Sequence, residues 1–161
     1  RLVFEHVDAA DYAELITREI GEKSRLDLVV LIENKLGKAF KLRPPFHPKE
    51  VARFHSLLIE AKLEVQFESD HEFLLLFNKR EDLAGGIFWK KTGPGIAHLE
   101  KIVISSKNRS TRLSIKLIEN LFQHLILKKY KYLTVGFFQS GLFYKLGFEI
   151  NQKFGGLVKK L

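Results

Sequence analysis

The stretch ISSKNRSTRLSIKLIENLFQHL, residues Ile104 to Leu125, passes from the end of an apolar strand directly into an amphipathic helix. The helix is indicated by apolar residues that share one face at helical spacing, namely Leu113, Leu117, Ile118, Leu121, Phe122 and Leu125. The first N–H groups of a helix lack intrahelical partners, and the helix dipole favours an anion there. The turn is therefore a candidate phosphate site, although it is rich in basic residues and hydroxyls and contains no glycine.

The segments on either side of this stretch predict a sheet with one parallel step. Residues Ile96 to Ser105 are typical of a long strand, and KYLTVGFF, residues Lys131 to Phe138, predicts another. A helix that crosses over between two strands of one sheet makes them parallel. Such a step creates a place where neighbouring strands part at their carboxyl ends, which is a common ligand position.

An antiparallel meander is expected before the crossover. Residues Leu63 to Phe67 alternate, EFLLLFN from Glu72 to Asn78 is a continuous apolar strand, and GIFWKKT from Gly86 to Thr92 is a further strand. Turns are expected at EDLAGG and at Gly93 to Gly95. After the crossover, a short helix SGLFYKLG ends at Gly147, and FEI and GLVKKL predict two closing strands.

The amino-terminal third is less regular. Residues Leu2 to Val7 suggest a strand, and Asp8 is a plausible N-cap for a helix that follows it. Residues Leu26 to Leu36 suit either a helix or a buried strand, and we favour the helix because Gly37 offers a C-terminal stop. After the breaker KLRPPFHP, a helix begins near Pro48 with the apolar stripe Val51, Phe54, Leu57, Leu58 and Ala61.

Composition limits the classes of function. A length of 161 residues fits one domain, so we expect a single domain over residues 1–161, and a first residue other than methionine suggests excision from a longer chain. With no cysteine, disulfides, thiolate metal sites and cysteine nucleophiles are excluded, and the six histidines lack metal-ligand spacing. A cytoplasmic location fits this composition, and no apolar run approaches the ~18 residues of a membrane span.

The charge balance indicates an anionic partner or only solubility. The chain has 27 basic and 19 acidic residues, a net charge of +8. The basic pairs at Lys90, Lys128 and Lys159 are scattered, so we do not expect nucleic acid to be the partner. A phosphorylated small molecule remains compatible with the charge.

The order of elements, together with two motifs, resembles the GCN5-related N-acetyltransferase (GNAT) superfamily. The acyl-CoA loop of that family has Arg or Gln, two residues, Gly, one residue, then Gly or Ala; this chain has Arg109, Arg112 and Ser114 in that frame. The aromatic segment FYKLGFE, Phe143 to Glu149, is similar to the family's closing helix-to-strand segment. The resemblance covers most of the chain and implies a GNAT-like α+β fold, with a mixed, mostly antiparallel twisted sheet flanked by helices.

The resemblance implies acetyl-CoA, or another acyl-CoA, as co-substrate, with no metal. Its pyrophosphate would lie against the turn and the first helical residues, Arg109, Ser110, Thr111, Arg112, Leu113 and Ser114, where guanidinium and hydroxyl groups suit phosphate. Its pantetheine amides would pair with the free backbone edge at Ile102, Val103 and Ile104. Arg112 stands where the family usually has glycine, so its side chain either crowds the pyrophosphate or holds it.

Transfer of an acyl group to an amine needs a base that takes the amine proton. Because alternate residues of a strand share a face, we expect His98, Glu100, Ile102 and Ile104 to point in one direction. Glu100 and His98 are therefore the two candidate bases, next to the strand end where acyl-CoA would lie. The alternative is an exposed, solvated pair.

The candidate acid is Tyr144. Family members often have a tyrosine one residue earlier, where this chain has Phe143. We favour packing of both aromatic side chains in the core, in which case the reaction uses another acid or none. Trp89, on a meander strand, is expected in the core or as a wall of the acceptor site.

These observations predict an N-acetyltransferase that acts on a primary amine of a small molecule or peptide, with a homodimer left open. A catalytically inactive GNAT-fold regulatory or interaction domain is the alternative, favoured by the missing glycines and the displaced tyrosine. LGKAF near Gly37, with HLEKIVISS, also resembles the acetyltransferase domain of vertebrate-type N-acetylglutamate synthases. That finer resemblance implies an amino acid acceptor such as glutamate, whose carboxylates Lys38, Lys41 or Arg43 would bind.

Overall fold

The chain forms a sheet flanked by helices in a computed structural model that describes residues 30–33, 38–108, 111–136 and 140–161. The strands are β1 (Val30–Glu33), β2 (Ala39–Arg43), β3 (His71–Phe77), β4 (Leu83–Gly93), β5 (Ile96–Ile104), β6 (Tyr132–Val135), β7 (Glu149–Asn151) and β8 (Gly156–Lys160). The helices are α2 (Pro48–Glu60), α3 (Thr111–Leu127), α4 (Ser140–Lys145) and the 3-10 helix η3 (Gln152–Phe154). The strand and helix predicted around Leu2 to Val7 and Asp8 lie outside the described residues.

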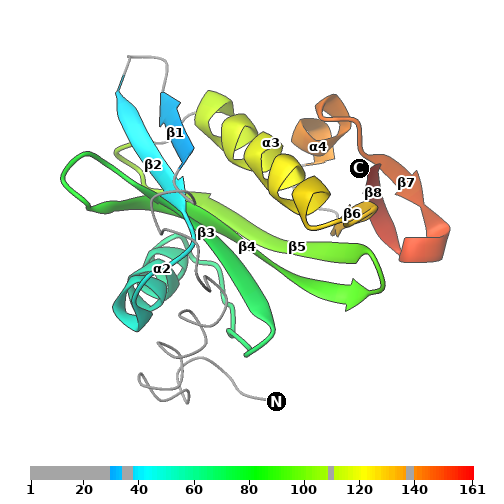
Figure 1. Cartoon of the computed structure of the whole chain (residues 1–161), viewed down its shortest axis with the longest axis horizontal. Coiled ribbons are helices and arrows are strands. Elements are labelled where there is room, and N and C mark those ends of the chain that lie inside the picture. Colours follow the sequence, from blue (N-terminus) through cyan, green and yellow to red (C-terminus); the bar gives the residue numbers. More distant parts are fainter. Residues whose placement is uncertain (1–29, 34–37, 109–110, 137–139) are drawn as a thin grey trace.

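The eight strands make one sheet in the order β1-β2-β3-β4-β5-β6-β8-β7. Only β5 and β6 are parallel neighbours; every other described pair is antiparallel. The crossover between them is α3, as the strand–helix–strand pattern predicted. In Figure 1, α2 lies on one side of the sheet, and α3 and α4 lie on the other. The predicted α+β class, with a mixed and mostly antiparallel sheet, is confirmed.

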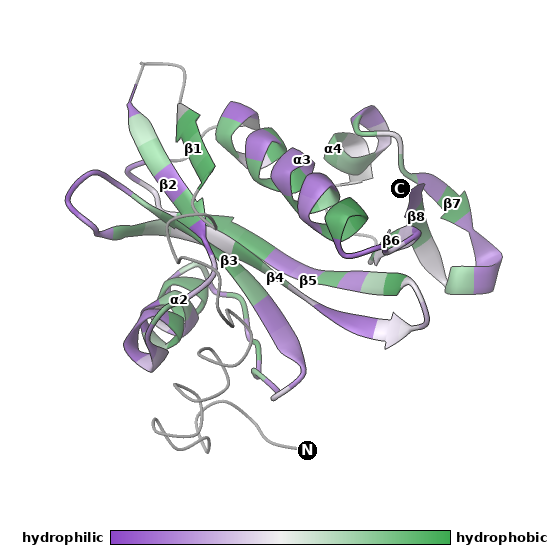
Figure 2. Ribbon diagram, viewed as in Figure 1, coloured by the Kyte–Doolittle hydropathy of each residue, from purple (hydrophilic) through white to green (hydrophobic). Residues whose placement is uncertain are grey.

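The sheet separates two hydrophobic cores. The larger core packs the buried face of α3 and Phe143 of α4 against β4, β5 and β6. The smaller core packs Val51, Phe54 and Leu58 of α2 against Phe residues of β3 and β4. The hydropathy colouring shows the apolar strands between these two helical layers (Figure 2). None of the described helices has the length and apolar character needed to cross a membrane.

Two glycines let the α2 layer and the neighbouring strand approach β4 closely. A Cβ atom on Gly86 would lie 2.8 Å from the ring of Phe54 and 2.9 Å from Leu75. A Cβ on Gly85 would lie 2.4 Å from the carbonyl oxygen of Val103. Both glycines are therefore strand residues with no room for a side chain. The predicted EDLAGG turn is wrong in its last four residues, because β4 already begins at Leu83.

Two other predictions need correction. Residues Val30 to Glu33 are strand β1, paired with β2, and not the favoured helix. A short apolar run fits both structures, and the antiparallel partner on β2 decides between them. The alternating residues Leu63 to Phe67 form no strand, although Phe67 is buried among the aromatic rings of the smaller core. The predicted helix from Pro48 and the strands at β3 and β5 are confirmed.

Candidate active site

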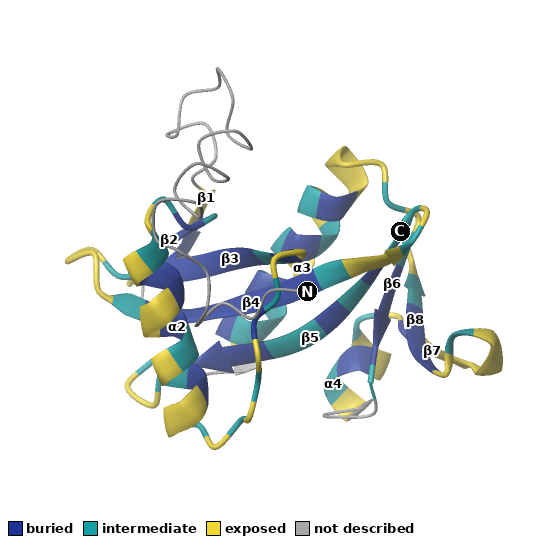
Figure 3. Cartoon of the chain, turned by 90° about the horizontal axis from the view of Figure 1, so that it is seen from below, coloured by how far each residue is buried: buried dark blue, intermediate teal, exposed yellow. Residues whose placement is uncertain are grey.

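The parallel pair β5–β6 parts after a few residues. Its ladder runs from Ile96–Tyr132 to Leu99–Val135 and ends there, whereas β5 continues to Ile104 against β4. Seen from below, β5 and β6 diverge towards their carboxyl ends (Figure 3). The β6 side of β5 is therefore left without a strand partner among the described residues from Glu100 onward, where a ligand with amide groups could pair.

A β-bulge marks the point of parting. Phe88 of β4 pairs with Lys101 and Trp89 pairs with Leu99, so Glu100 is an extra residue in β5 with no partner on β4. A bulge bends the strand and increases its local twist, and bulges recur next to active sites. The residue that sequence reasoning selected as a base is thus the bulged residue itself.

The bulge also changes which side chains share a face. We expected His98, Glu100, Ile102 and Ile104 on one face, but Ile102 and Ile104 belong to the α3-side core together with Leu99. The extra residue reverses the alternation beyond Glu100, so the expectation is wrong for the two isoleucines. His98 and Glu100 remain together, with 3.9 Å between His98 Nε2 and Glu100 Oε1.

Five polar side chains lie close together on four neighbouring strands, and we call them the cross-strand cluster: His71, Lys90, His98, Glu100 and Thr134. His71 pairs with Lys90, Lys90 with His98, and His98 with Thr134 in the sheet register. Glu100 stands between the two histidines, with its Oε2 3.7 Å from Nε2 of His71. His71 and Thr134 are buried, whereas the His98 and Glu100 side chains are 34% and 29% exposed, so a ligand can reach them.

His98 is anchored by Thr134. Its Nδ1 lies 2.6 Å from the Thr134 hydroxyl, which in turn lies 3.4 Å from the carbonyl oxygen of Ala97. Burial lowers the pKa of His98 below its ordinary value, helped by Lys90 and Lys101 and opposed by Glu100. The imidazole is therefore neutral at physiological pH and able to accept a proton.

Glu100 is held as a carboxylate. The interaction with His71 lowers its pKa below the ordinary value, and the neighbouring His98 and Lys90 act in the same direction, whereas burial opposes them. At neutral pH, two proton acceptors thus stand side by side at the parted edge of β5. The alternative, that His98 and Glu100 are an exposed and solvated pair, is not supported, because both side chains are about two-thirds covered.

The turn before α3 is described only in part. Arg109 and Ser110, and the side chain of Thr111, lie outside the described residues. Before them, Asn108 Nδ2 donates to the Ser105 hydroxyl at 2.9 Å. Within the first turn of α3, Arg112 is exposed and Leu113 is fully buried in the core, with Ser114 partly covered. Arg112 therefore does not fill the protein interior at the position where the family has glycine.

The aromatic residues divide between core and surface. Phe143 is fully buried and packs edge-on against Phe148 with ring centroids 5.1 Å apart. Tyr144 is 46% exposed, so the expectation that both pack in the core is wrong for Tyr144. The helical rotation of about 100° per residue explains the difference. Trp89 is a core residue, fully buried against α3 with its ring 5.5 Å from that of His124.

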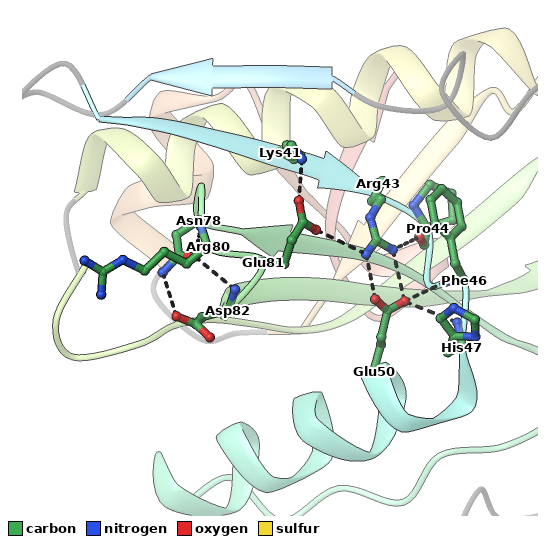
Figure 4. Close-up of polar contacts among 10 residues, drawn as sticks. All are labelled: Lys41, Arg43, Pro44, Phe46, His47, Glu50, Asn78, Arg80, Glu81 and Asp82. Carbon is green, nitrogen blue, oxygen red and sulfur yellow. Dashed lines mark hydrogen bonds and ion pairs between the residues drawn. The ribbon is translucent and has the colours of Figure 1, made fainter.

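The basic residues that we considered as binding partners for the carboxylates of an amino acid acceptor already have partners within the protein. Figure 4 shows Arg43 and Glu50 side by side, joined by two hydrogen bonds of 3.0 and 2.6 Å. Glu50 also accepts from the backbone N–H groups of Phe46 and His47, which fixes the start of α2. Burial raises the pKa of Glu50, but Arg43 and these backbone donors outweigh it, so the pKa lies below its ordinary value. Lys41 forms an ion pair with Glu81. Arg43 thus anchors α2 to β2 and is not available to a ligand.

His71, Lys90 and Thr134 are the members of the cross-strand cluster that sequence reasoning did not select. They lie on different strands from Glu100, and β4 separates β3 from β5 in the sheet. No local spacing brings them together, so only the sheet register shows their proximity. Among the described residues, no group of three or more His, Cys, Asp or Glu side chains is arranged to hold a metal ion.

Comparison with known proteins supports the architecture. No family model and no curated protein matches the sequence. A GNAT-family acetyltransferase structure from Listeria monocytogenes matches with a TM-score of 0.64 at 16% identity, covering 82% of this chain and 100% of that one. The chain has the GNAT fold. A GNAT-family acetyltransferase from Elizabethkingia anophelis with acetyl-CoA bound matches with a TM-score of 0.54 at 15% identity, over 76% of this chain and 98% of that one.

A third GNAT-fold structure, an acetyltransferase from Staphylococcus aureus, matches with a TM-score of 0.53 at 16% identity, over 83% of this chain and 99% of that one. At these identities the likeness establishes the fold, and the activity has to be argued from the site. None of these comparisons supports the finer resemblance to N-acetylglutamate synthases.

Proposed function

We propose that this protein is an acyl-CoA-dependent N-acyltransferase that transfers an acetyl group to a primary amine. The observation that carries the proposal is the parted edge of β5, which begins at the bulged Glu100. An unpaired strand edge suits the pantetheine amides of an acyl-CoA, and the same position holds two proton acceptors. The GNAT fold adds support, since a structure with that fold contains acetyl-CoA.

The chemistry requires one proton acceptor and one leaving group. The neutral amine attacks the thioester carbon, a C–N bond forms, and the C–S bond breaks to release the CoA thiolate. Glu100, with His98 beside it, takes the proton that the amine loses, directly or through water. The thiolate takes a proton from Tyr144 or from water. Because the pKa of Glu100 is lowered, the base is ionised before the substrate arrives.

We assign the pyrophosphate of the acyl-CoA to the start of α3. The exposed side chain of Arg112 favours holding a phosphate over blocking it, because a guanidinium in solvent can swing toward an anion. Replacing Arg112 with glycine should therefore weaken acetyl-CoA binding. Tighter binding by that variant would show that the arginine crowds the site.

The function is tested by binding and by turnover. Acetyl-CoA is titrated into the protein by calorimetry, and CoA release is then measured with a thiol reagent over amino acids, polyamines and peptides. The chain contains no cysteine, so the protein itself gives no thiol signal. No binding at millimolar acetyl-CoA would refute the proposal.

Glu100→Gln is the decisive variant. We expect it to lower kcat by about 10²–10⁴-fold while acetyl-CoA binding stays the same, because it removes the base and keeps the shape. Glu72→Gln is the matched control: Glu72 lies on β3 and bonds Lys128, beyond the end of α3. Equal activity of the two variants would contradict the role of Glu100.

The second candidate function is a non-catalytic domain with the same fold. It is favoured by Arg112 in place of the family's glycine and by Phe143 where the family often has tyrosine. This alternative predicts acyl-CoA binding without CoA release for every amine tested. The screen described above distinguishes the two functions.

A further inference from the structure

His71 is buried with only one of its ring nitrogens hydrogen-bonded. Its side chain is 1% exposed, and Nδ1 accepts the backbone N–H of Glu68 at 2.9 Å. Its Nε2 is buried and has no hydrogen-bond partner among the described residues. An unsatisfied buried polar group destabilises the folded state, so native proteins retain few of them. Among the described residues, the carboxylate of Glu100 approaches Nε2, with Oε2 at 3.7 Å.

The bond to Glu68 fixes which nitrogen carries the proton. Because Nδ1 accepts a hydrogen bond, its lone pair is occupied and the ring proton is on Nε2. His71 therefore presents an N–H donor to Glu100. The same arrangement leaves Nε2 without the lone pair that a metal ion would need, which excludes a metal site shared by His71, His98 and Glu100.

The ring of His71 is held in place, whereas the carboxylate can move. The ring packs edge-on against Phe88, with centroids 5.0 Å apart, and against Phe67 at 6.4 Å. Glu100 is 29% exposed and lies on the bulge. A small rotation of the Glu100 side chain would shorten the distance between its Oε2 and Nε2 of His71 from 3.7 Å to that of a hydrogen bond, ~2.9 Å. Catalytic hydrogen bonds are often long before the substrate binds.

We propose that His71 is a positioning residue whose Nε2–H holds Oε2 of Glu100, so that Oε1 faces the amine next to His98. This inference rests on the proposed function. The groups that face Glu100 are His71 from β3, Lys90 from β4 and His98 from β5. Of these, His71 alone is fully buried and directs a fixed donor at one oxygen. Loss of that donor should raise the pKa of Glu100 and leave its carboxylate less well aligned.

Two variants of His71 separate the donor from the acceptor. His71→Asn keeps an acceptor for the Glu68 N–H and loses the donor at the Nε2 position. His71→Gln keeps a donor at the Nε2 position. His55→Asn is the matched control, because His55 packs against the same Phe67 ring at 5.2 Å and bonds Val65 instead of Glu100.

The first measurement needs no activity. The carboxyl carbon of Glu100 is followed by NMR as a function of pH in the full chain and assigned by its loss in Glu100→Gln. We expect the midpoint to move to higher pH in His71→Asn and to stay near the wild-type value in His71→Gln and His55→Asn. An unchanged midpoint in His71→Asn overturns the inference, whatever the activity. If that variant does not fold, His71→Phe likewise removes the donor at the Nε2 position, and the same shift of the midpoint is expected.

The second measurement is kinetic. In His71→Asn we expect kcat to fall by about 10–100-fold, with the KM for the amine changed less, and the acidic limb of the pH profile to move upward. Recovery in His71→Gln supports positioning, whereas equal loss in both variants overturns it. Absence of CoA release by the wild-type protein would refute the proposed function instead, and the NMR titration would still decide the role of His71.

Discussion

Replacing His124 with glutamine should remove much of the acid sensitivity of this protein between pH 6.5 and 4. The His124 ring packs against Trp89 in the α3-side core. Burial lowers its pKa from 6.5 to about 4, the charge of Lys128 acts in the same direction, and Glu72 opposes both. Folding therefore requires His124 to stay neutral under conditions in which the unfolded chain would protonate it.

The direction and the size of the change in stability with pH follow from the linkage between folding and protonation of His124. Between pH 6.5 and 4 the unfolded state binds a proton that the folded state does not, so stability is complete above pH 6.5 and falls as the pH drops. At ~1.4 kcal/mol per pH unit, the difference between the two pKa values corresponds to about 3 kcal/mol at most. Partial exposure of the ring reduces this value.

The assay is urea unfolding at pH 7, 6, 5 and 4.5. Unfolding is followed by far-UV circular dichroism, because the substitution changes the surroundings of Trp89 and would alter a tryptophan signal. His98 also has a lowered pKa, so the difference between wild type and His124→Gln isolates the contribution of His124. Because burial is the largest cause, most of that difference should persist in 1 M NaCl, where surface charges are screened. Equal loss of stability with pH in the two proteins would refute the reasoning.

Three further predictions concern the scaffold and the acid. Gly85→Ala should destabilise the protein by about 1–3 kcal/mol in urea unfolding, because its Cβ would meet the backbone carbonyl of Val103; a change below ~0.5 kcal/mol would contradict the packing. Arg43→Met and Glu50→Gln should each cost about 3 kcal/mol, and the double variant less than their sum, as a double-mutant cycle would measure; simple additivity would argue against a coupled pair. Tyr144→Phe should leave stability within ~0.5 kcal/mol of wild type, since the ring is 46% exposed, and should lower kcat by about 10²-fold if Tyr144 is the acid; unaltered kcat would exclude it.

The sequence predicted the elements whose periodicity is long and unambiguous. Helix α3 shows an apolar stripe over its whole length, and Pro48 marks the start of α2, so both were assigned correctly. The sequence favours a helix over Leu26 to Leu36, which includes strand β1, because a short apolar run suits either structure, and only pairing with β2 decides. Local sequence patterns were therefore sufficient to predict the crossover helix. The strand at the edge of the sheet could be identified only from its pairing with β2.

Only the part of the site that lies on a single strand could be predicted from the sequence. Glu100 and His98 are two residues apart on one strand, so their proximity followed from strand geometry. The bulge is marked by neither glycine nor proline, and its one local signal is the polar pair Glu100 and Lys101, which interrupts the apolar alternation between Leu99 and Ile102. The contact between His71 and Glu100 depends on the register of three strands, which no spacing in the sequence encodes.

The bulge at Glu100 also constrains how the length of this strand can change in evolution. Deleting one residue at Glu100, or inserting one in β4 opposite it, would restore an uninterrupted pleat. Deleting Glu100 would leave Ile102 and Ile104 in the α3-side core, because Leu99 and Lys101 would keep their partners on β4, but it would remove the base. An insertion in β4 opposite Glu100 would instead turn Ile102 and Ile104 onto the opposite face. We therefore expect related chains that use this base to retain the extra residue in β5, so that the base and the core residues beyond it keep their opposite phases.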